Sequence, residues 1–182
     1  IDYSINIFSN HKKIDSVIVV CHPDWTEKIK KENPNHTIIS GGKTRKKSCY
    51  NGFYECDENA DNILIHDAVR PFVTDNMISE CIYGLENHNA VSPAIPINDS
   101  IILKNRNKYK KINRDNLFCL QTPQGFKKEI LKEILSENSN DTDEIGTYVN
   151  MFPNKPPYIF LGDNKNFKIT SKQDMIIANS YL

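Results

Sequence analysis

Cysteine pairs, excess charge and long apolar runs are all missing from this chain, and each absence excludes a class of protein. The five cysteines are scattered and form no C-x-x-C pair, so we expect free thiols in a reducing cytosol and neither a disulfide framework nor a zinc site. Lys+Arg and Asp+Glu both number 23, and this balance gives no reason to expect a nucleic-acid or membrane partner. No apolar stretch approaches the roughly 20 residues of a membrane helix.

The sequence also lacks repeats, a low-complexity linker, a visible signal peptide and an initiator methionine. Its 182 residues are enough for one domain with a full core. A hydrophobic fraction of 38% and a charged fraction of 25% fit a soluble globular protein. We therefore expect a single cytoplasmic domain over residues 1–182, and a chain that begins inside a longer protein.

Short apolar segments alternate with helical patterns along the first half of the chain. Strands are predicted at residues 15–21, 37–40, 63–66 and 90–97, and helices at 25–32, 44–56 and after the capping residue Thr74. This alternation implies right-handed βαβ units and a mostly parallel sheet. Later segments predict a hairpin at 101–112, helices at 127–135 and from Thr142, a strand at 157–161, and a final helix opened by a capping box at Ser171.

The segment Ile63–Phe72 carries the first candidate site. Its apolar run ends in Asp67, and Arg70 follows three residues later, directly before a proline. Ligands of open α/β sheets bind at the carboxyl ends of strands, and magnesium prefers carboxylate and phosphate oxygens. Asp67 is therefore a candidate metal ligand, and Arg70 can pair with a phosphate. The alternative is that Asp67 caps the turn and Arg70 merely pairs with it.

The segment Gly41–Ser48 joins a predicted strand to a predicted helix. Paired glycines allow a base or phosphate to approach the backbone closely. The helix N-terminus, three lysines and Arg45 favour an anion. An ordinary glycine turn followed by a solvated basic helix start explains the same residues.

Two later segments add polar residues at rigid or alternating positions. Arg114 precedes the turn Gln121–Phe126, whose amides and hydroxyls can line a polyol or base pocket, although a structural loop is the alternative. Lys168 alternates with apolar residues over 166–170, which predicts a strand edge that points a lysine into a cleft. A solvent-facing lysine on a half-buried strand is the alternative there.

Together, the order and spacing of these motifs resemble one enzyme family. I-H-D-A-V-R-P-F, R-D-N-L-F-C-L-Q-T-P-Q-G-F, T-D-E and N-F-K-I-T, followed by an acidic capping box, resemble the 2-C-methyl-D-erythritol 4-phosphate cytidylyltransferases from Tyr3 to the C-terminus. Ribitol-5-phosphate cytidylyltransferases are close relatives. The resemblance implies a Rossmann-like nucleotidyltransferase with helices on both faces of its sheet. It also implies a homodimer whose β-hairpin arm, here residues 99–114, crosses to the partner subunit.

The implied reaction joins CTP to a polyol phosphate and releases pyrophosphate, with Mg²⁺ as cofactor. The resemblance assigns roles residue by residue. It assigns nucleotide binding to Gly42, Lys43, Arg45, Ser48, Asp67 and Ala68. It assigns binding of the polyol phosphate to Ser100, Arg114, Thr122, Thr142 and Lys168. Catalysis is assigned to Lys168 and Arg114, and metal binding to Asp67. The family often has an acid at the position of Lys43, and a threonine at that of Ser100. Arg70 is expected chiefly to hold the Asp67 turn, since the arm and Lys168 are better candidates for contact with the phosphates.

The family also begins with a strand and a glycine-rich loop bearing an arginine and a lysine, and this sequence starts after them. We expect that segment to precede the chain. Three other functions stay open or are disfavoured on these residues. Ribitol-5-phosphate is the alternative substrate, a non-catalytic homologue is the alternative of another class, and a dinucleotide-dependent dehydrogenase is disfavoured for want of G-x-G-x-x-G.

Overall fold

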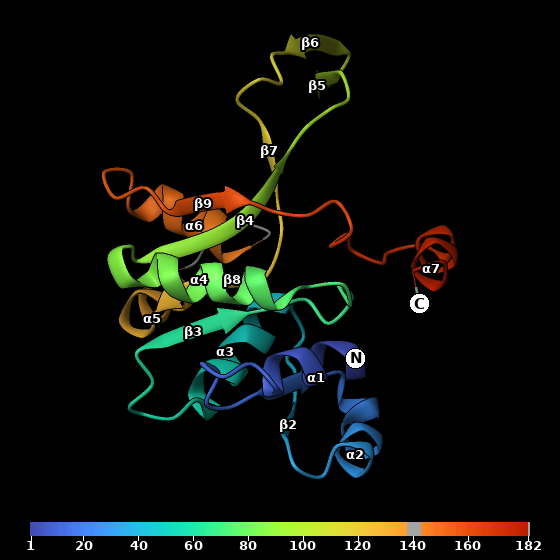
Figure 1. The fold of residues 1–182 in the computed structure, drawn as a ribbon. Helices are drawn as coiled ribbons and strands as arrows, with labels where there is room; N and C mark the ends of the chain where they lie inside the picture. Colours follow the sequence, from blue (N-terminus) through green and yellow to red (C-terminus); the bar gives the residue numbers. More distant parts are fainter. Residues whose placement is uncertain (138–142, 182) are drawn as a thin grey trace.

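The structure, a computed structural model, describes residues 1–137 and 143–181 (Figure 1). Its helices and strands follow one another as α1 (Asp2–Ser9), β1 (Ile18–Cys21), α2 (Pro23–Glu32), β2 (Thr37–Ser40), α3 (Arg45–Glu55), β3 (Asn62–Ile65), α4 (Asp75–Asn87), β4 (Ala90–Pro96), β5 (Ile101–Asn105), β6 (Lys108–Ile112), β7 (Phe118–Leu120), β8 (Gln124–Lys127), α5 (Lys128–Ser136), α6 (Glu144–Met151), β9 (Tyr158–Leu161) and α7 (Lys172–Asn179).

The central sheet is mixed, with strand order β3-β8-β4-β7 and with β9 paired to β4. β8 runs antiparallel to both β3 and β4, β7 runs antiparallel to β4, and only β9 runs parallel to it. β1 and β2 form a separate parallel pair. The prediction of an α/β fold is confirmed, but the prediction of a mostly parallel sheet is wrong for this central sheet.

The error comes from β8, which the sequence presents as a proline turn rather than a strand. Since β3 and β4 are both antiparallel to β8, they run parallel to each other, as a βαβ unit through α4 requires. β8 inserts between them, so the two strands of that unit are not hydrogen-bonded neighbours. Insertion of a strand from later in the chain leaves no trace in the local pattern of β3, α4 and β4.

Helices cover both faces of the central sheet and bury separate apolar clusters. On one face, α4 packs Cys81 and Leu85 against Val91 of β4, and all three side chains are fully buried. On the other face, Leu131 of α5 and Tyr148 of α6 pack with Phe126 of β8. Alternation of side chains along the strands feeds the two clusters from opposite sides of the sheet.

Most of the predicted helix ends and strands agree with the structure. Thr74 caps α4 by accepting from Met77 N–H at 3.2 Å, and Ser171 and Asp174 form the predicted capping box. The helix expected from Thr142 begins at Glu144 with Asp143 as its N-cap, and Thr142 lies outside the described residues. The strand expected at 166–170 is absent there, because that segment is an irregular loop.

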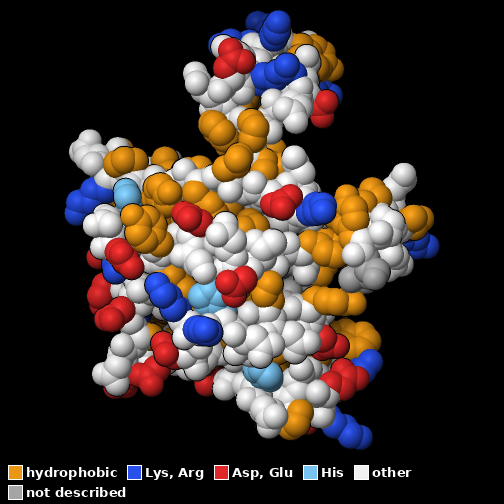
Figure 2. Space-filling view, viewed as in Figure 1, with side chains coloured by type: hydrophobic (Ala, Val, Ile, Leu, Met, Phe, Trp, Pro, Cys, Tyr) orange, Lys and Arg blue, Asp and Glu red, His pale blue; other side chains and the backbone are white. Residues whose placement is uncertain are grey.

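The predicted hairpin is present as β5 and β6, which pair antiparallel from Ile101↔Ile112 to Asn105↔Lys108. It projects from the body as a separate lobe (Figures 1 and 2), with Lys and Arg side chains gathered on it. Ile102 and Tyr109 are more than half exposed. A role for this arm in dimerisation stays a prediction.

The described residues include no helix that combines the length and apolar character needed to cross a membrane. The five cysteines are free thiols, as predicted.

Candidate active site

The site is built around Asp67, which follows the carboxyl end of β3. The turn after the strand is closed by a hydrogen bond from Arg70 N–H to the Asp67 carbonyl at 2.9 Å. The Asp67 N–H donates to Thr122 Oγ1 at 3.1 Å. Strand, turn and threonine together fix the direction of the Asp67 side chain.

Three cationic side chains from different parts of the chain surround this carboxylate. Lys168 Nζ lies 2.9 Å from Asp67 Oδ2. Arg70 Nε lies 3.7 Å from the same oxygen, and Arg45 Nε lies 3.9 Å from Oδ1. Burial alone raises the pKa of Asp67, but the hydrogen bond and charge of Lys168, aided by both arginines, outweigh it and lower that pKa. Asp67 is therefore ionised at neutral pH.

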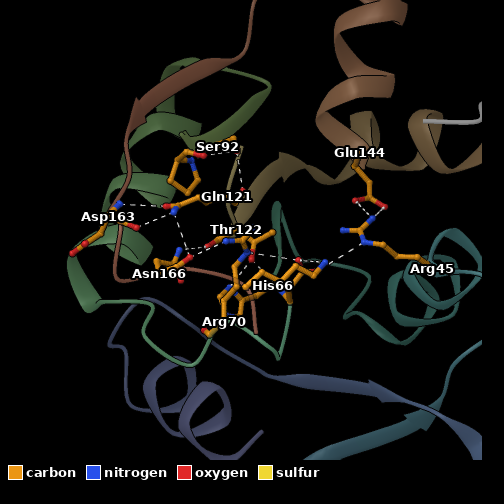
Figure 3. A network of polar contacts seen from close by, with 12 residues as sticks. Arg45, His66, Arg70, Ser92, Gln121, Thr122, Glu144, Asp163 and Asn166 are labelled. Carbon is orange, nitrogen blue, oxygen red and sulfur yellow. Dashed lines mark hydrogen bonds and ion pairs between the residues drawn. The ribbon is translucent and has the colours of Figure 1, made fainter. Parts of the chain in front are cut away.

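Arg45, at the start of α3, also reaches the buried carboxylate of Glu144 at the start of α6. Arg45 Nη1 lies 2.7 Å from Oε1 and 2.6 Å from Oε2, and Figure 3 shows the two side chains facing each other from the two helices. Burial opposes the positive charge of Arg45, but Glu144 outweighs it and raises the pKa of Arg45. An acid at this end of α6 also suits the helix dipole.

Arg70 joins the Asp67 turn to the loop that carries Lys168. Its Nη1 donates to the Asn166 carbonyl at 2.8 Å, and Ile169 N–H donates to the Val69 carbonyl at 2.9 Å. Asn166 is itself fully buried and donates from Nδ2 to the Thr122 carbonyl at 2.9 Å. The expectation that Arg70 holds the Asp67 turn agrees with these contacts, which further show that Arg70 also holds the Lys168 loop.

His66 and Thr122 form the floor under the Asp67 turn. His66 Nε2 lies 3.1 Å from the Arg70 carbonyl, and His66 Nδ1 lies 3.0 Å from Thr122 Oγ1. A carbonyl only accepts, so Nε2 carries the proton and Nδ1 accepts from the Thr122 hydroxyl. Burial lowers the pKa of His66 to about 4, so the ring is neutral at neutral pH and all three groups are satisfied.

The predicted cytidine segment lies where β2 leads into α3. Gly42 N–H donates to Ser48 Oγ at 3.1 Å, and Thr44 caps α3 by accepting from Lys47 N–H. A Cβ on Gly41 would lie 2.7 Å from Ser48 Oγ and 3.2 Å from the Cys21 carbonyl, so this turn folds too closely on its neighbours for a side chain. Lys43 is exposed beside the turn.

The structure thus brings Arg45, Asp67 and Lys168 into contact and leaves other predicted residues apart. Arg114 and Ser100 are exposed at the base of the arm, where Arg114 Nη1 donates to the Asn98 carbonyl. Neither contacts the Asp67 carboxylate within the described parts of the chain. Ala68 is exposed beside Asp67, and the Thr122 hydroxyl is buried and engaged as described above.

Three residues of this site were given no role from the sequence: His66, Glu144 and Asn166. Glu144 appeared only as the last residue of the T-D-E motif. Gln121 was expected to line a polyol or base pocket, but it supports a loop. Gln121 Nε2 donates to the Asp163 carbonyl at 2.8 Å, and so supports the loop before Lys168 (Figure 3). In the structure, supporting residues of this kind are recognised as buried polar side chains that hydrogen-bond to an irregular loop. Loops are usually exposed, and the sequence of a loop does not show that it is buried, so these residues could not be identified from the sequence.

A divalent metal can take at most part of its ligands from this site. Among the described residues, no three His, Cys, Asp or Glu side chains lie close enough together to hold a metal ion. Asp67 Oδ1 is the less closely paired oxygen of this carboxylate, because Lys168 lies 2.9 Å from Oδ2 whereas Arg45 Nε lies 3.9 Å from Oδ1. Magnesium often binds through one or two carboxylates plus substrate phosphates and water, so Asp67 fits as a single ligand to an ion that arrives with a nucleotide.

Comparison with known proteins identifies the family. The family profile described as "IspD: 2-C-methyl-D-erythritol 4-phosphate cytidylyltransferase" matches residues 1–182. A protein of that name from Clostridium botulinum strain Eklund 17B is 35% identical over 97% of this chain and 83% of its own length. The one from Clostridium tetani is 31% identical over 100% and 78%.

Solved structures agree in fold. The 4-diphosphocytidyl-2C-methyl-D-erythritol synthase from Anaerococcus prevotii superposes with a TM-score of 0.90 at 27% identity, covering 99% of this chain and 84% of that one. The 2-C-methyl-D-erythritol 4-phosphate cytidylyltransferase from Francisella tularensis gives a TM-score of 0.85 at 26% identity, covering 100% and 87%.

Proposed function

Since the chain belongs to the 2-C-methyl-D-erythritol 4-phosphate cytidylyltransferase family, we propose that it transfers CMP from CTP to 2-C-methyl-D-erythritol 4-phosphate. A phosphate oxygen of the polyol phosphate attacks the α-phosphorus of CTP. The new P–O bond forms as the bond to the β-phosphate oxygen breaks, and pyrophosphate leaves. The observation that carries this proposal is the contact of Lys168 and Arg45 with Asp67 at the end of β3.

Positioning and charge neutralisation account for catalysis in this proposal, and no covalent intermediate is needed. Lys168 is the catalytic cation: its ammonium group moves from Asp67 to the reacting phosphates. Asp67 would supply one oxygen ligand to a Mg²⁺ ion bound with CTP, and that ion would neutralise part of the phosphate charge. The partial burial of the cluster strengthens these charges, because water screens them less.

The nucleotide is held, in this proposal, by the segment from Gly42 to Ser48 together with Asp67 and Ala68. The hydrogen bond from Gly42 N–H to Ser48 Oγ supports a preformed turn there, and Arg45 links that turn to Asp67. Lys43 is exposed and available to a phosphate. Cytidine is selected largely by backbone groups and by lack of room for a purine.

The polyol phosphate is assigned to Ser100, Arg114, Thr122, Thr142 and Lys168. Arg114 and Ser100 lie on the arm base, so we propose that the arm delivers them across a homodimer to the partner subunit's site. The exposed apolar residues of the arm, among them Ile102 and Tyr109, support an interface there. Thr122 acts in part through Asp67, whose backbone it holds.

A substrate assay tests the proposed function. The full chain is given CTP, Mg²⁺ and either 2-C-methyl-D-erythritol 4-phosphate or ribitol 5-phosphate, and pyrophosphate release is measured. We expect a higher kcat/KM with the methylerythritol phosphate. A preference for ribitol 5-phosphate would assign the chain to CDP-ribitol synthesis, and no release with either would favour the non-catalytic alternative. The cytoplasmic location stays a prediction, with which the five free thiols agree.

A further inference from the structure

Glu144 is a buried acid for which the proposed reaction has no direct use. Its side chain is only 5% exposed, and both of its oxygens face a single nitrogen of Arg45 at 2.7 and 2.6 Å. Burial of a charged carboxylate is energetically unfavourable unless it forms an ion pair, so Glu144 needs a cationic partner that stays in place. Arg45 is that partner, 99 residues away in the sequence.

The position of Glu144 is set by the core and not by Arg45. The residues that follow it on α6, Ile145 and Tyr148, are almost fully buried and pack with Phe126 and Leu131. Asp143 caps the helix by accepting from Gly146 N–H at 2.7 Å. Arg45, by contrast, is a long side chain that is 35% exposed. The ion pair therefore fixes the position of the Arg45 side chain, whereas the position of Glu144 is already fixed by the core.

This pair determines how close Arg45 comes to Asp67. With Nη1 on Glu144, Arg45 Nε stays 3.9 Å from Asp67 Oδ1, which is beyond hydrogen-bonding distance. Lys168 lies at 2.9 Å from the other oxygen. Among the described residues, no cationic group therefore lies within hydrogen-bonding distance of Oδ1. Figure 3 shows Arg45 directed toward Glu144.

We propose that Glu144 is a positioning residue that holds Arg45 back from Asp67 and so keeps Oδ1 available to the Mg²⁺ that accompanies CTP. The proposal rests on the proposed function, since it assumes that Asp67 faces a nucleotide-bound metal. Without the charge of Glu144, Asp67 is the acid within reach of Arg45. A guanidinium can take both oxygens of a carboxylate in a bidentate pair, and Mg²⁺ then has to displace it.

The test is Glu144→Gln, which keeps the shape and one acceptor oxygen of Glu144 but removes its charge. CTP binding is measured by calorimetry over a series of Mg²⁺ concentrations, without polyol phosphate and hence without turnover. We expect the Mg²⁺ concentration for half-maximal CTP binding to rise by on the order of tenfold, the effect of one added charge-assisted contact. CTP affinity at saturating Mg²⁺ should stay near that of the wild type. An unchanged Mg²⁺ requirement, or a loss of affinity at every Mg²⁺ concentration alike, overturns the proposal.

Two further variants separate positioning from folding. Asp75→Asn removes an acid from the same first position of α4, where the side chain is 76% exposed, and should leave the Mg²⁺ requirement unchanged. Adding Arg45→Gln to Glu144→Gln should bring the Mg²⁺ concentration for half-maximal CTP binding back toward that of the Arg45→Gln single variant, because the group that closes on Asp67 is gone. The comparison is made with that single variant, since Arg45 also belongs to the proposed nucleotide-binding segment. If Glu144→Gln does not fold, Glu144→Asp retains the charge on a shorter side chain, and a raised Mg²⁺ requirement in that variant counts against the proposal.

Failure of this inference and failure of the proposed function give different results. If the wild-type chain binds no CTP at any Mg²⁺ concentration, the proposed function fails. If the wild type binds CTP and Glu144→Gln shows the same Mg²⁺ requirement, only the role of Glu144 fails.

Discussion

The Asp67 site and the β5–β6 arm are two very different environments for residues assigned to one reaction. At the site, Asp67 is held through its backbone and its carboxylate by Arg70 of its own turn and by groups from three other segments of the chain. On the arm, Arg114 and Ser100 are exposed, and Arg114 contacts a backbone carbonyl at the arm base. The comparison shows that the groups around Asp67 are already organised within the single chain. Arg114 and Ser100 on the arm become part of a site only when a substrate or another subunit is brought to them.

Loss of Lys168 should have the largest effect, because this cation lies in the preorganised half. We expect Lys168→Ala to lower kcat about 10²- to 10³-fold, as the loss of one preorganised electrostatic contact does. Lys165→Ala is the matched control in the same loop, since Lys165 lies over the Tyr181 ring and away from Asp67. Steady-state pyrophosphate release measures both. Equal losses in the two variants would contradict the assignment of Lys168.

Acid should weaken the preorganised site through His66. The pKa of His66 is lowered to about 4 in the folded chain, so the unfolded chain binds the proton first as pH falls below about 6.5. The free energy of unfolding therefore declines between about pH 6.5 and pH 4, by about 3 kcal/mol in total at 1.36 kcal/mol per pKa unit. Asp67, with its lowered pKa, adds a loss in the same direction at lower pH.

Urea unfolding across this pH range checks the prediction. His66→Gln should flatten the decline, because the group whose pKa is lowered by burial is gone. A decline of equal size in wild type and His66→Gln would show that the Asp67 turn does not depend on a neutral ring.

Removal of Arg114 tests the other half of the comparison. We expect Arg114→Ala to raise KM for the polyol phosphate or lower kcat by about 10²-fold. The fold should stay intact, because the hydrogen bond from Arg114 to the Asn98 carbonyl is exposed. Lys110→Ala, on the exposed strand β6, is the control. Steady-state kinetics with each substrate varied in turn would separate the two effects.

Mixing subunits tests whether the arm serves the partner. Heterodimers of Arg114→Ala and Lys168→Ala contain one intact site if the arm crosses between subunits, and activity should reappear on mixing. Two inactive proteins that stay inactive when refolded together would mean that Arg114 serves its own chain.

Loss of a supporting residue should have the smallest effect of the set and should appear in stability. Asn166→Ala removes the donor to the Thr122 carbonyl from a fully buried position. We expect the free energy of unfolding to fall by about 1–3 kcal/mol, the cost of an unsatisfied buried group. Asn164→Ala in the exposed part of the same loop is the control, measured by urea unfolding.

The parts of the fold that could be predicted are those with local causes. Thr74 and Ser171 satisfy N–H groups within three residues of themselves, so their roles as helix caps follow from the sequence alone. The β5–β6 hairpin likewise pairs residues close in the chain. β8 was missed because it becomes a strand only through partners in β3 and β4.

The same division runs through the site. Asp67 at a strand end and Lys168 in its motif were predicted as site residues, and the structure places them 2.9 Å apart. The reason expected for Lys168 was wrong, since an irregular loop held by Arg70 and Asn166 presents it, and not a strand edge.

By itself, the sequence determined the local elements and the kinds of residue available for phosphate and metal chemistry, because hydrophobic period, capping and residue type act over a few positions. Only the tertiary structure decided that β8 separates β3 from β4 and that Glu144 takes hold of Arg45. Those outcomes depend on which distant segments share a core, and the free energy of burying them together belongs to no single segment.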